Sequence, residues 1–399
     1  MNPPNQISVV ELHPASYKYL LKGHPWIIKD NYTAKFRAKD RLLWTTDKKS
    51  GKQFTLLNDT AHPKIKARFW STGHVDLEQF QIDLRNRLRN AFNKRVDLLS
   101  QREDIFLSVG EADRLSGLVI LKLGQGILIQ SYSKLWKKFQ KDMVPYLRDE
   151  LAVELQMEVS WIAWQDRETE AQSKLTPLWG KMPEEFTLRE FNTEYKVKLA
   201  GGHDLGIYPD MAAIRKRFSY AFEGKRVLNL YSYTGAWSLY PYSAGASFVT
   251  SVDLSPKYMD WLKENIQIND YDMNDFDFKV GDVIDSMKEL VASGEKFDFI
   301  ICDPPSFSSD GKKTTTALKN YENIFPFLQK LISDEGQALL FINTHGLSKE
   351  KFEVTMNGFS QKARLRKVKS ITPSEDIRSL EGFPEGDYLK GILYQKGKS

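Results

Sequence analysis

The 399-residue chain has a single cysteine, which limits the disulfides and metal sites that it can form. One cysteine excludes an internal disulfide and fits a reducing cytoplasm. The six histidines are scattered without zinc-like spacing to that cysteine, so we expect no metal site. No stretch approaches the roughly eighteen apolar residues of a membrane helix, and the start MNPPNQISVVELHP lacks a secretory pattern. We therefore expect a cytoplasmic protein with no membrane partner.

Charge is unevenly distributed along the chain, whose net charge is +5. Residues 1–100 hold 18 Lys and Arg against 9 Asp and Glu, and the remaining 299 residues hold 39 against 43. A basic end joined to a near-neutral body suits a phosphate-backbone partner. An ordinary solvated lysine-rich surface is an equally open interpretation.

The pattern of expected strands and helices changes twice along the chain, which predicts three domains. Residues 1–73 contain short strand-like pieces such as HPWIIKD and QFTLLND, typical of a small β-rich module. Residues 74–195 combine helices and two hairpins, the second turning at Asn192–Thr193, and read as a small α+β domain. Residues 196–399 alternate strands and helices, which predicts a Rossmann-like α/β domain with a parallel sheet.

A helix beginning at Leu77 has an apolar stripe at Phe80, Leu84, Leu88 and Phe92. Basic residues interrupt the stripe, and we expect them to form an exposed surface that binds RNA. They are Arg85, Arg87, Arg89, Lys94 and Arg95.

Three predicted strands of the α/β region end on a carboxylate: Asp253, Asp282 and Asp303. A single acidic strand end usually caps a helix, but three on successive strands favour a ligand site. Ligands of open α/β sheets bind beyond the carboxyl ends of the strands. We therefore expect the three acids at one edge of the sheet.

The loop after the first of these strands, NLYSYTGAW, carries one glycine, Gly235. A dinucleotide site needs three glycines in G-x-G-x-x-G to approach a pyrophosphate, so a nicotinamide oxidoreductase is disfavoured. Asp253 lies 18 residues beyond Gly235, near the spacing at which an acid takes ribose hydroxyls. A nucleoside without phosphate suits this loop, and S-adenosylmethionine is the natural candidate.

The run VLNLYSYTGAWSLY…VTSVDLSPKYMDWLKENIQIN…FDFIICDPPSF resembles the methyltransferase domain of bacterial 23S rRNA large-subunit methyltransferases. KGHPWIIKDN and KARFWS resemble the PUA module that opens the cytosine-C5 branch of that family, and VGEADRLSGLVILKLG resembles its middle domain. The resemblance spans nearly the whole chain. It implies a class I methyltransferase domain over 196–399, a PUA-like domain over 1–73 and a middle domain over 74–195.

The resemblance also implies roles for individual residues. Gly235 marks the cofactor loop, Asp253 the ribose acid and Asp282 the residue near the adenine. HDLGIYPDMAAIR matches the family segment that closes over the cofactor, although Met211 and Ala212 replace the usual Gln-Arg. The cofactor-binding residues implied are Tyr208, Asp210, Arg215, Tyr231, Ser232, Tyr233, Thr234, Gly235, Asp253, Leu254, Asp282, Val283 and Asp303.

The loop DPPSF follows Asp303 and carries the expected base contacts. Pro304 and Pro305 fix an extended backbone and remove two N–H groups, which stiffens the loop. Phe307 is in a position to stack on an extruded base, with core packing as the alternative.

The cytosine-C5 relatives carry a catalytic cysteine just after the fifth strand, where this chain has Thr344. Cys302 does not replace it, because strand alternation points Cys302 away from Asp303. The loops DPPSFSS and INTH also resemble the related domain that makes 7-methylguanosine, so Asp303, Asn343 and His345 are the catalytic candidates. An RNA methyltransferase acting on 23S rRNA is therefore expected, by family on cytosine-C5, with a guanine nitrogen as the alternative. An inactive RNA-binding assembly factor is a further alternative, and the question of a homodimer is open.

Overall fold

The computed structural model describes residues 7–167, 174–200, 204–305, 307–309, 314–374, 376–377 and 379–398, with the backbone alone at 307–309 and 314–317. The chain forms two compact units. Unit 1 contains residues 1–185, 199–205 and 376–386, and unit 2 contains residues 186–198, 206–375 and 387–399. The three domains expected from the sequence stay a prediction.

The described residues of unit 1 form two five-stranded sheets, with strand orders β1-β3-β4-β5-β2 and β10-β9-β8-β7-β6. The strands of the first are β1 (Ile7–Val9), β2 (Trp26–Ile28), β3 (Leu42–Thr46), β4 (Gln53–Asn58) and β5 (Ile65–Thr72). Those of the second are β6 (Asp104–Val109), β7 (Leu118–Leu123), β8 (Gly126–Ser131), β9 (Trp161–Asp166) and β10 (Leu175–Gly180). The two-residue turn between β7 and β8 is the expected hairpin.

The helices of unit 1 are α1 (Pro14–Leu21), α2 (Leu77–Asn93), α3 (Gln140–Pro145) and α4 (Ala152–Glu154). The apolar stripe of α2 is buried, with Phe80 and Leu88 fully inaccessible to solvent. One apolar cluster runs from Leu42 and Trp70 through this stripe to Ile162. The two sheets of unit 1 therefore share part of their core.

Residues 376–386, which we call the strap, belong to unit 1 although they lie between two strands of unit 2. Arg102 forms an ion pair with the buried carboxylate of Asp376. At the other end of the strap, the ring of Phe383 packs edge-on against Trp26, with centroids 4.6 Å apart. Charge pairing and aromatic packing thus hold a distant piece of chain on unit 1.

Unit 2 is built on a seven-stranded sheet, as far as the structure describes it, in the order β15-β14-β13-β16-β19-β21-β20. The strands are β13 (Arg226–Leu230), β14 (Phe248–Asp253), β15 (Phe276–Val280), β16 (Phe297–Cys302), β19 (Ile332–Asn343), β20 (Leu365–Ile371) and β21 (Leu389–Lys396). The first five are mutually parallel, and β21 runs antiparallel to both β19 and β20. This topology confirms the expected Rossmann-like α/β fold.

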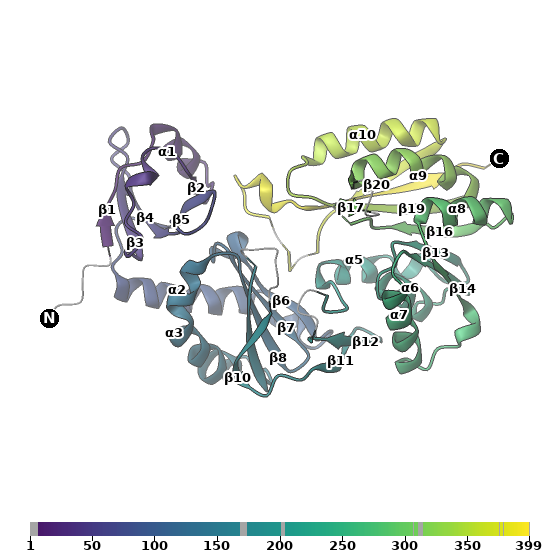
Figure 1. Ribbon diagram of the computed structural model, residues 1–399, viewed down its shortest axis with the longest axis horizontal. Helices are drawn as coiled ribbons and strands as arrows, with labels where there is room; N and C mark the ends of the chain where they lie inside the picture. Colours follow the sequence, from purple (N-terminus) through teal and green to yellow (C-terminus); the bar gives the residue numbers. More distant parts are fainter. Residues whose placement is uncertain are drawn as a thin grey trace. The chain divides into compact units, whose positions relative to one another are not determined.

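Helices cover both faces of this sheet (Figure 1). They are α5 (Ala212–Arg217), α6 (Ala236–Ser243), α7 (Pro256–Ile268), α8 (Val283–Ala292), α9 (Ala317–Leu331) and α10 (Lys349–Lys362). Alternate strand residues such as Leu228 and Ile300 pack against α8, α9 and α10, and α5, α6 and α7 lie on the opposite face. None of the helices described in either unit is long and apolar enough to span a bilayer.

Two short hairpins complete unit 2. They are β11 (Glu185–Glu190) with β12 (Thr193–Lys198), and β17 (Phe307–Ser309) with β18 (Thr314–Thr316). The first hairpin turns at Phe191–Asn192, one residue earlier than expected, because Phe191 adopts the left-handed conformation with φ 55° and Thr193 already pairs in β12.

Candidate functional site

The strand order of unit 2 reverses between β13 and β16. From β13 the chain proceeds outward through β14 and β15, whereas β16 and β19 lie on the other side. Leu230 pairs with both Val252 and Cys302, so the next residues of each strand emerge in one row. Such a switch point is where open α/β sheets bind ligands. The expected common edge of strand-end acids is confirmed.

The loop Tyr231–Gly235 leaves β13 at this switch point in an unusual conformation. Tyr231, Tyr233 and Gly235 have positive φ values of 61°, 51° and 93°. A Cβ atom at Gly235 would lie 2.1 Å from Cδ1 of Leu262, so both the φ angle and the packing require glycine there. Left-handed non-glycine residues store strain that often accompanies function.

Asp253 ends β14 and faces this loop. Its carboxylate accepts hydrogen bonds from the backbone N–H groups of Tyr233 at 2.8 Å and Ser255 at 2.9 Å. Burial raises the pKa of Asp253, and these backbone bonds oppose the rise. Leu254 beside it is 61% exposed, which leaves an apolar side chain facing solvent next to a partly buried acid.

The other predicted cofactor residues lie along the same edge. Asp282 is exposed and caps α8 by accepting bonds from the N–H groups of Ile284 and Asp285. Val283 is only 3% exposed, and its side chain packs into the core. Tyr208 is 55% exposed, and its ring lies 5.3 Å from that of Tyr233.

The loop and Asp253 together fit a nucleoside with a short polar tail. The Oγ atom of Ser232 is buried and has no hydrogen-bond partner among the described residues. A buried hydroxyl without a partner is costly and suits a site that a polar ligand completes. Asp253 offers a carboxylate to hydroxyl donors, and the single glycine leaves no phosphate cradle. These residues fit S-adenosylmethionine.

Asp303 follows β16 directly and has the electrostatics of a proton acceptor. Burial raises the pKa of Asp303 to about 7, the charge of Asp210 adds to this rise, and Arg215 opposes it. Pro304 is buried and Pro305 is exposed, while the side chain of Phe307 lies outside the described residues. A carboxyl group with a pKa near neutrality can gain and lose a proton under physiological conditions.

Tyr388 connects two other candidates, and the sequence reasoning did not single it out. Its hydroxyl donates to Oδ2 of Asp210 at 3.2 Å, and its ring centroid lies 5.3 Å from that of His345. His345 is exposed, and Asn343 is the last residue of β19. The sequence signal available for Tyr388 was its place just before the last strand.

Arg215 was expected to bind the cofactor, and the structure shows it as one partner of a buried ion pair. Its guanidinium group is 1% exposed and forms a two-bond ion pair with Glu190, which is fully buried. Arg215 therefore joins the β11–β12 hairpin to α5. Its positive charge also acts on Asp303 at the strand edge, where it lowers the pKa of that carboxyl group. Glu190 was missed because nothing in its local sequence marks a buried ion pair.

Cys302 is inaccessible to solvent and belongs to the core cluster of α8, α9 and α10. Burial raises the pKa of its thiol, which disfavours the thiolate form. Tyr321 donates a hydrogen bond to the carbonyl oxygen of Cys302 at 2.9 Å. This buried position agrees with the expectation that Cys302 does not replace the missing catalytic cysteine.

The expected basic surface of α2 is only partly present. Arg95 is 4% exposed, pairs with Asp113 at 2.8 Å and donates to the carbonyl oxygen of Asp376, so its expected exposure is wrong. Arg87 lies over the ring of Trp70 at 3.4 Å and donates to two backbone carbonyls. Its long side chain covers apolar surface instead of projecting into solvent.

The three remaining basic residues of α2 retain exposed surface. Arg85 pairs with Glu150, Arg89 with Glu154 and Lys94 with Asp113, and each basic side chain is at least 39% exposed. Their role in binding RNA stays a prediction.

Comparisons with known proteins agree with this geometry. Residues 117–377 match the family of S-adenosylmethionine-dependent methyltransferases. The chain is 27% identical to ribosomal RNA large subunit methyltransferase I of Pseudoalteromonas translucida (strain TAC 125), covering 97% of this chain and 98% of the relative. It is 29% identical to the putative ribosomal RNA large subunit methyltransferase YwbD of Bacillus subtilis (strain 168), covering 98% and 99%.

Two solved structures share the fold. A putative methyltransferase complexed with SAH superimposes with a TM-score of 0.84 at 20% identity, covering 98% of this chain and 99% of the other. A putative SAM-dependent methyltransferase from Streptococcus mutans gives a TM-score of 0.82 at 20% identity, with the same coverage. The matched residues 117–377 include the loop Tyr231–Gly235, Asp253 and Asp303, and the chain belongs to the S-adenosylmethionine-dependent methyltransferase family.

Proposed function

We propose that this enzyme methylates a base of large-subunit ribosomal RNA, with 23S rRNA as the expected substrate. The observation that carries the proposal is the likeness to two relatives named as rRNA large subunit methyltransferases, which covers 97% and 98% of this chain. The likeness therefore includes unit 1 as well as the methyltransferase fold of unit 2. Such an enzyme would work in the cytoplasm, where ribosomes are assembled.

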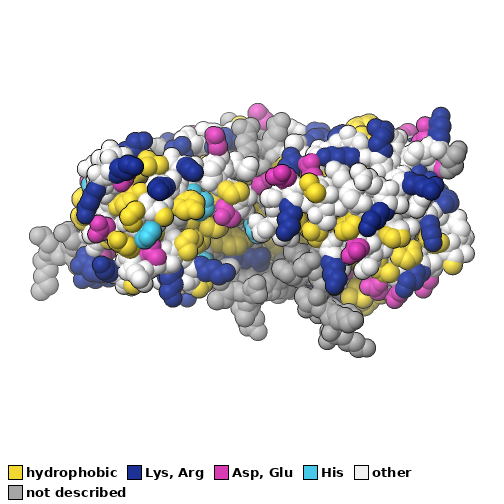
Figure 2. Space-filling model, turned by 90° about the horizontal axis from the view of Figure 1, so that it is seen from above, with side chains coloured by type: hydrophobic (Ala, Val, Ile, Leu, Met, Phe, Trp, Pro, Cys, Tyr) yellow, Lys and Arg dark blue, Asp and Glu magenta, His cyan; other side chains and the backbone are white. Residues whose placement is uncertain are grey.

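Residues 1–195 are the proposed RNA-binding part, with 1–73 as a PUA-type module and 74–195 as a middle domain. The first hundred residues carry twice as many basic as acidic side chains. Lys29, Lys35 and Lys39 are exposed in the first module, and Arg85, Arg89 and Lys94 retain exposed surface on α2. Figure 2 shows Lys and Arg side chains spread over the visible face with apolar ones between them, which suits backbone contacts more than a single deep site.

The proposed acceptor is a base nitrogen, either guanine N7 or another ring or exocyclic nitrogen. S-adenosylmethionine supplies a methyl group on a positively charged sulfur, and Tyr231–Gly235, Asp253, Leu254 and Asp282 are the residues proposed to hold it. Methylation at cytosine C5 ordinarily needs a thiolate, and Cys302 is buried away from the strand edge. A nitrogen brings its own lone pair, so the protein has only to orient the base. Guanine N7 carries no proton, so there Asp303 would only orient the base. At a ring N–H or an exocyclic amino nitrogen, Asp303 would accept the proton that the nitrogen loses when it takes the methyl group from the sulfonium.

The test is incubation of the purified enzyme with tritiated S-adenosylmethionine and unmodified 23S rRNA, followed by mass spectrometry of the nucleosides. We expect label in RNA as an N-methylated nucleoside. The variant Thr344→Ala should keep its activity within a few-fold, because Thr344 is not proposed as a nucleophile. A 5-methylcytidine product would contradict the nitrogen acceptor. RNA binding without transfer would instead favour an assembly factor.

A further inference from the structure

Three segments of unit 2 converge where β21 begins. Leu389 pairs with Asn343, and Lys390 pairs with Ile342, so the start of β21 lies beside the end of β19. The third segment is the turn before α5, which contains Asp210. Tyr388 immediately precedes β21 and bonds to both of the other segments.

Tyr388 makes three contacts, each with a different residue of these segments. The phenol hydroxyl donates to the Asp210 carboxylate at 3.2 Å. The backbone carbonyl accepts a hydrogen bond from the N–H of Thr344 at 2.9 Å. The ring contacts the imidazole of His345, with centroids 5.3 Å apart. One residue therefore fixes a carboxylate on one segment relative to a turn on another.

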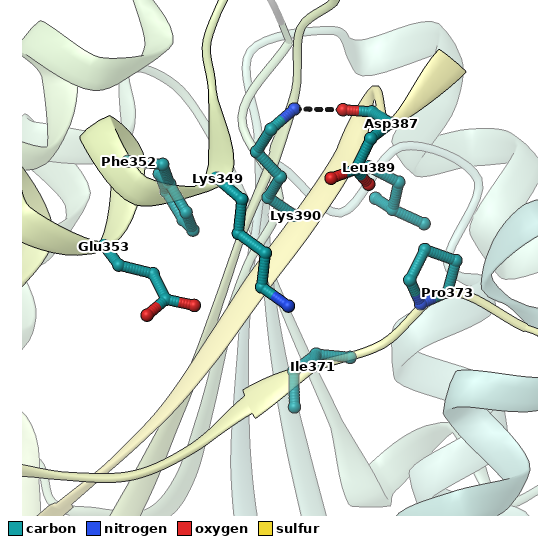
Figure 3. A pocket seen from close by; sticks show the side chains of 9 residues that line it. Lys349, Phe352, Glu353, Ile371, Pro373, Asp387, Leu389 and Lys390 are labelled. Atoms are coloured by element: carbon teal, nitrogen blue, oxygen red, sulfur yellow. Dashed lines mark hydrogen bonds between the residues drawn. The ribbon is translucent and has the colours of Figure 1, made fainter. Parts of the chain in front are cut away.

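Lys390 holds the backbone on both sides of Tyr388 and at Thr344 in place. Its side chain is 3% exposed, and its ammonium group donates to the carbonyl oxygens of Thr344 at 3.1 Å, Tyr388 at 3.4 Å and Asp387. Figure 3 shows Lys390 turned toward Asp387, whereas Lys349 extends the other way along the pocket. The N–H and the carbonyl of Thr344 are thus both engaged, which leaves the turn little freedom.

We propose that Tyr388 is a positioning residue for methyl transfer, which fixes the Asp210 carboxylate relative to the turn that carries His345. Tyr388 acts through Asp210, whose charge bears on Asp303, and does not itself receive the methyl group. The inference rests on the proposed transfer to an RNA base. Methyl transfer is faster when the catalytic groups are held in a productive geometry than when they are free to move.

The test is the variant Tyr388→Phe, which removes the hydroxyl and keeps the ring and backbone contacts. We expect kcat for RNA methylation to fall roughly tenfold, the effect of losing one hydrogen bond to a charged group. KM for S-adenosylmethionine and for RNA should stay within about twofold, since the hydroxyl is proposed to position the Asp210 carboxylate for the transfer step and not to bind either ligand. The matched control is Tyr394→Phe, on the strand β21 that follows Tyr388. The Tyr394 hydroxyl bonds Asn357 at 3.1 Å, away from the edge, and this variant should leave kcat unchanged.

A double-mutant cycle with Asp210→Asn separates positioning from a general loss of fold. If Tyr388 acts through Asp210, adding Tyr388→Phe to Asp210→Asn should lower kcat by less than about twofold. Unchanged kcat in Tyr388→Phe, or a full tenfold loss in both backgrounds, would overturn the inference.

Hydrogen exchange tests the same link without any acceptor. Backbone amides of residues 206–217 should exchange faster in Tyr388→Phe than in wild type or Tyr394→Phe, because the turn before α5 loses a tether. Unchanged exchange would overturn the positioning role. If wild type transfers no methyl group to RNA, the proposed function fails, and the exchange comparison still decides the role of Tyr388.

Discussion

Three buried carboxylates of unit 1 and the partly buried strand-end acid Asp303 of unit 2 have opposite surroundings. In unit 1, Asp59 pairs with Arg68 at 2.7 Å, Asp113 with Arg95 at 2.8 Å, and Asp376 with Arg102. All six of these side chains are at most 4% exposed. In unit 2, Asp303 is influenced most by burial and by a second acid, Asp210, with Arg215 as the weaker opposing charge.

The difference separates acids that hold the structure together from acids that are suited to proton transfer. A buried acid facing arginine stays charged and ties segments together, and breaking such a pair leaves an uncompensated charge. A buried acid beside another acid has a pKa shifted toward neutrality, which suits proton transfer. The first arrangement holds the strap on unit 1, and the second marks the strand edge of unit 2.

The largest effect on stability is expected from breaking one of the buried ion pairs of unit 1. The variant Asp376→Ala should destabilise unit 1 by about 3 kcal/mol, because it leaves the buried Arg102 with Asp104, 3.6 Å away, as its remaining carboxylate partner. Urea unfolding followed by tryptophan fluorescence measures this loss. A loss below about 1 kcal/mol would mean that the strap is held by its aromatic contacts instead.

The chemical side is tested by Asp303→Asn, which should lower kcat about 100-fold, in line with removal of a general base. Its matched control is Asp298→Asn, at the far end of the strand β16 that precedes Asp303. The Asp298 carboxylate accepts hydrogen bonds from the backbone N–H of Arg226 and the hydroxyl of Ser333. The control should lose some stability but keep kcat within about twofold. Comparable kcat losses in both variants would remove the distinction between the two acids.

The pH dependence of stability should also distinguish Asp303. Its folded pKa of about 7 lies above the ordinary value of 3.8, so between these values the folded state binds more protons than the unfolded state. The contribution of Asp303 to stability is therefore present at low pH and is lost as pH rises through about 7. Relative to Asp303→Asn, wild type should lose roughly 1–3 kcal/mol between pH 4 and pH 8, measured by urea unfolding. Parallel curves for the two proteins would exclude the raised pKa.

The smallest effect is expected for exposed pairs. Arg85 and Glu150 lie 3.1 Å apart and are each 50% exposed, so Arg85→Ala should change stability by less than about 1 kcal/mol. If Arg85 contacts an RNA phosphate, the variant should reduce the slope of log affinity against log salt by about 1. An unchanged slope in fluorescence-anisotropy titrations would remove Arg85 from the RNA surface.

The sequence predicted most of the architecture of unit 2 because its signals are local. Alternating apolar strands and helices predicted the sheet, and the strand-end acids Asp253, Asp282 and Asp303 predicted its ligand-binding edge. The lone glycine of the loop, Gly235, also indicated the ligand class. Each of these signals lies within a few residues of the feature that it predicts.

Long-range pairing limited the predictions elsewhere. Arg95 read as an exposed cation because its partners, Asp113 and the carbonyl of Asp376, lie 18 and 281 residues away. Arg215 read as a cofactor ligand because Glu190 is on another element. Tyr388 carried only the weak signal of its place before the last strand, since its significance comes from Asp210 at a separation of 178 residues.

The sequence by itself determined that this chain carries a parallel α/β sheet with acids at its strand ends and a single cysteine. Only the tertiary structure decided which charges are compensated, which aromatic hydroxyl meets which carboxylate, and to which unit the strap belongs. The physical reason is that strand and helix periodicity is encoded in neighbouring residues, whereas the state of a buried charge depends on groups brought together from distant parts of the chain.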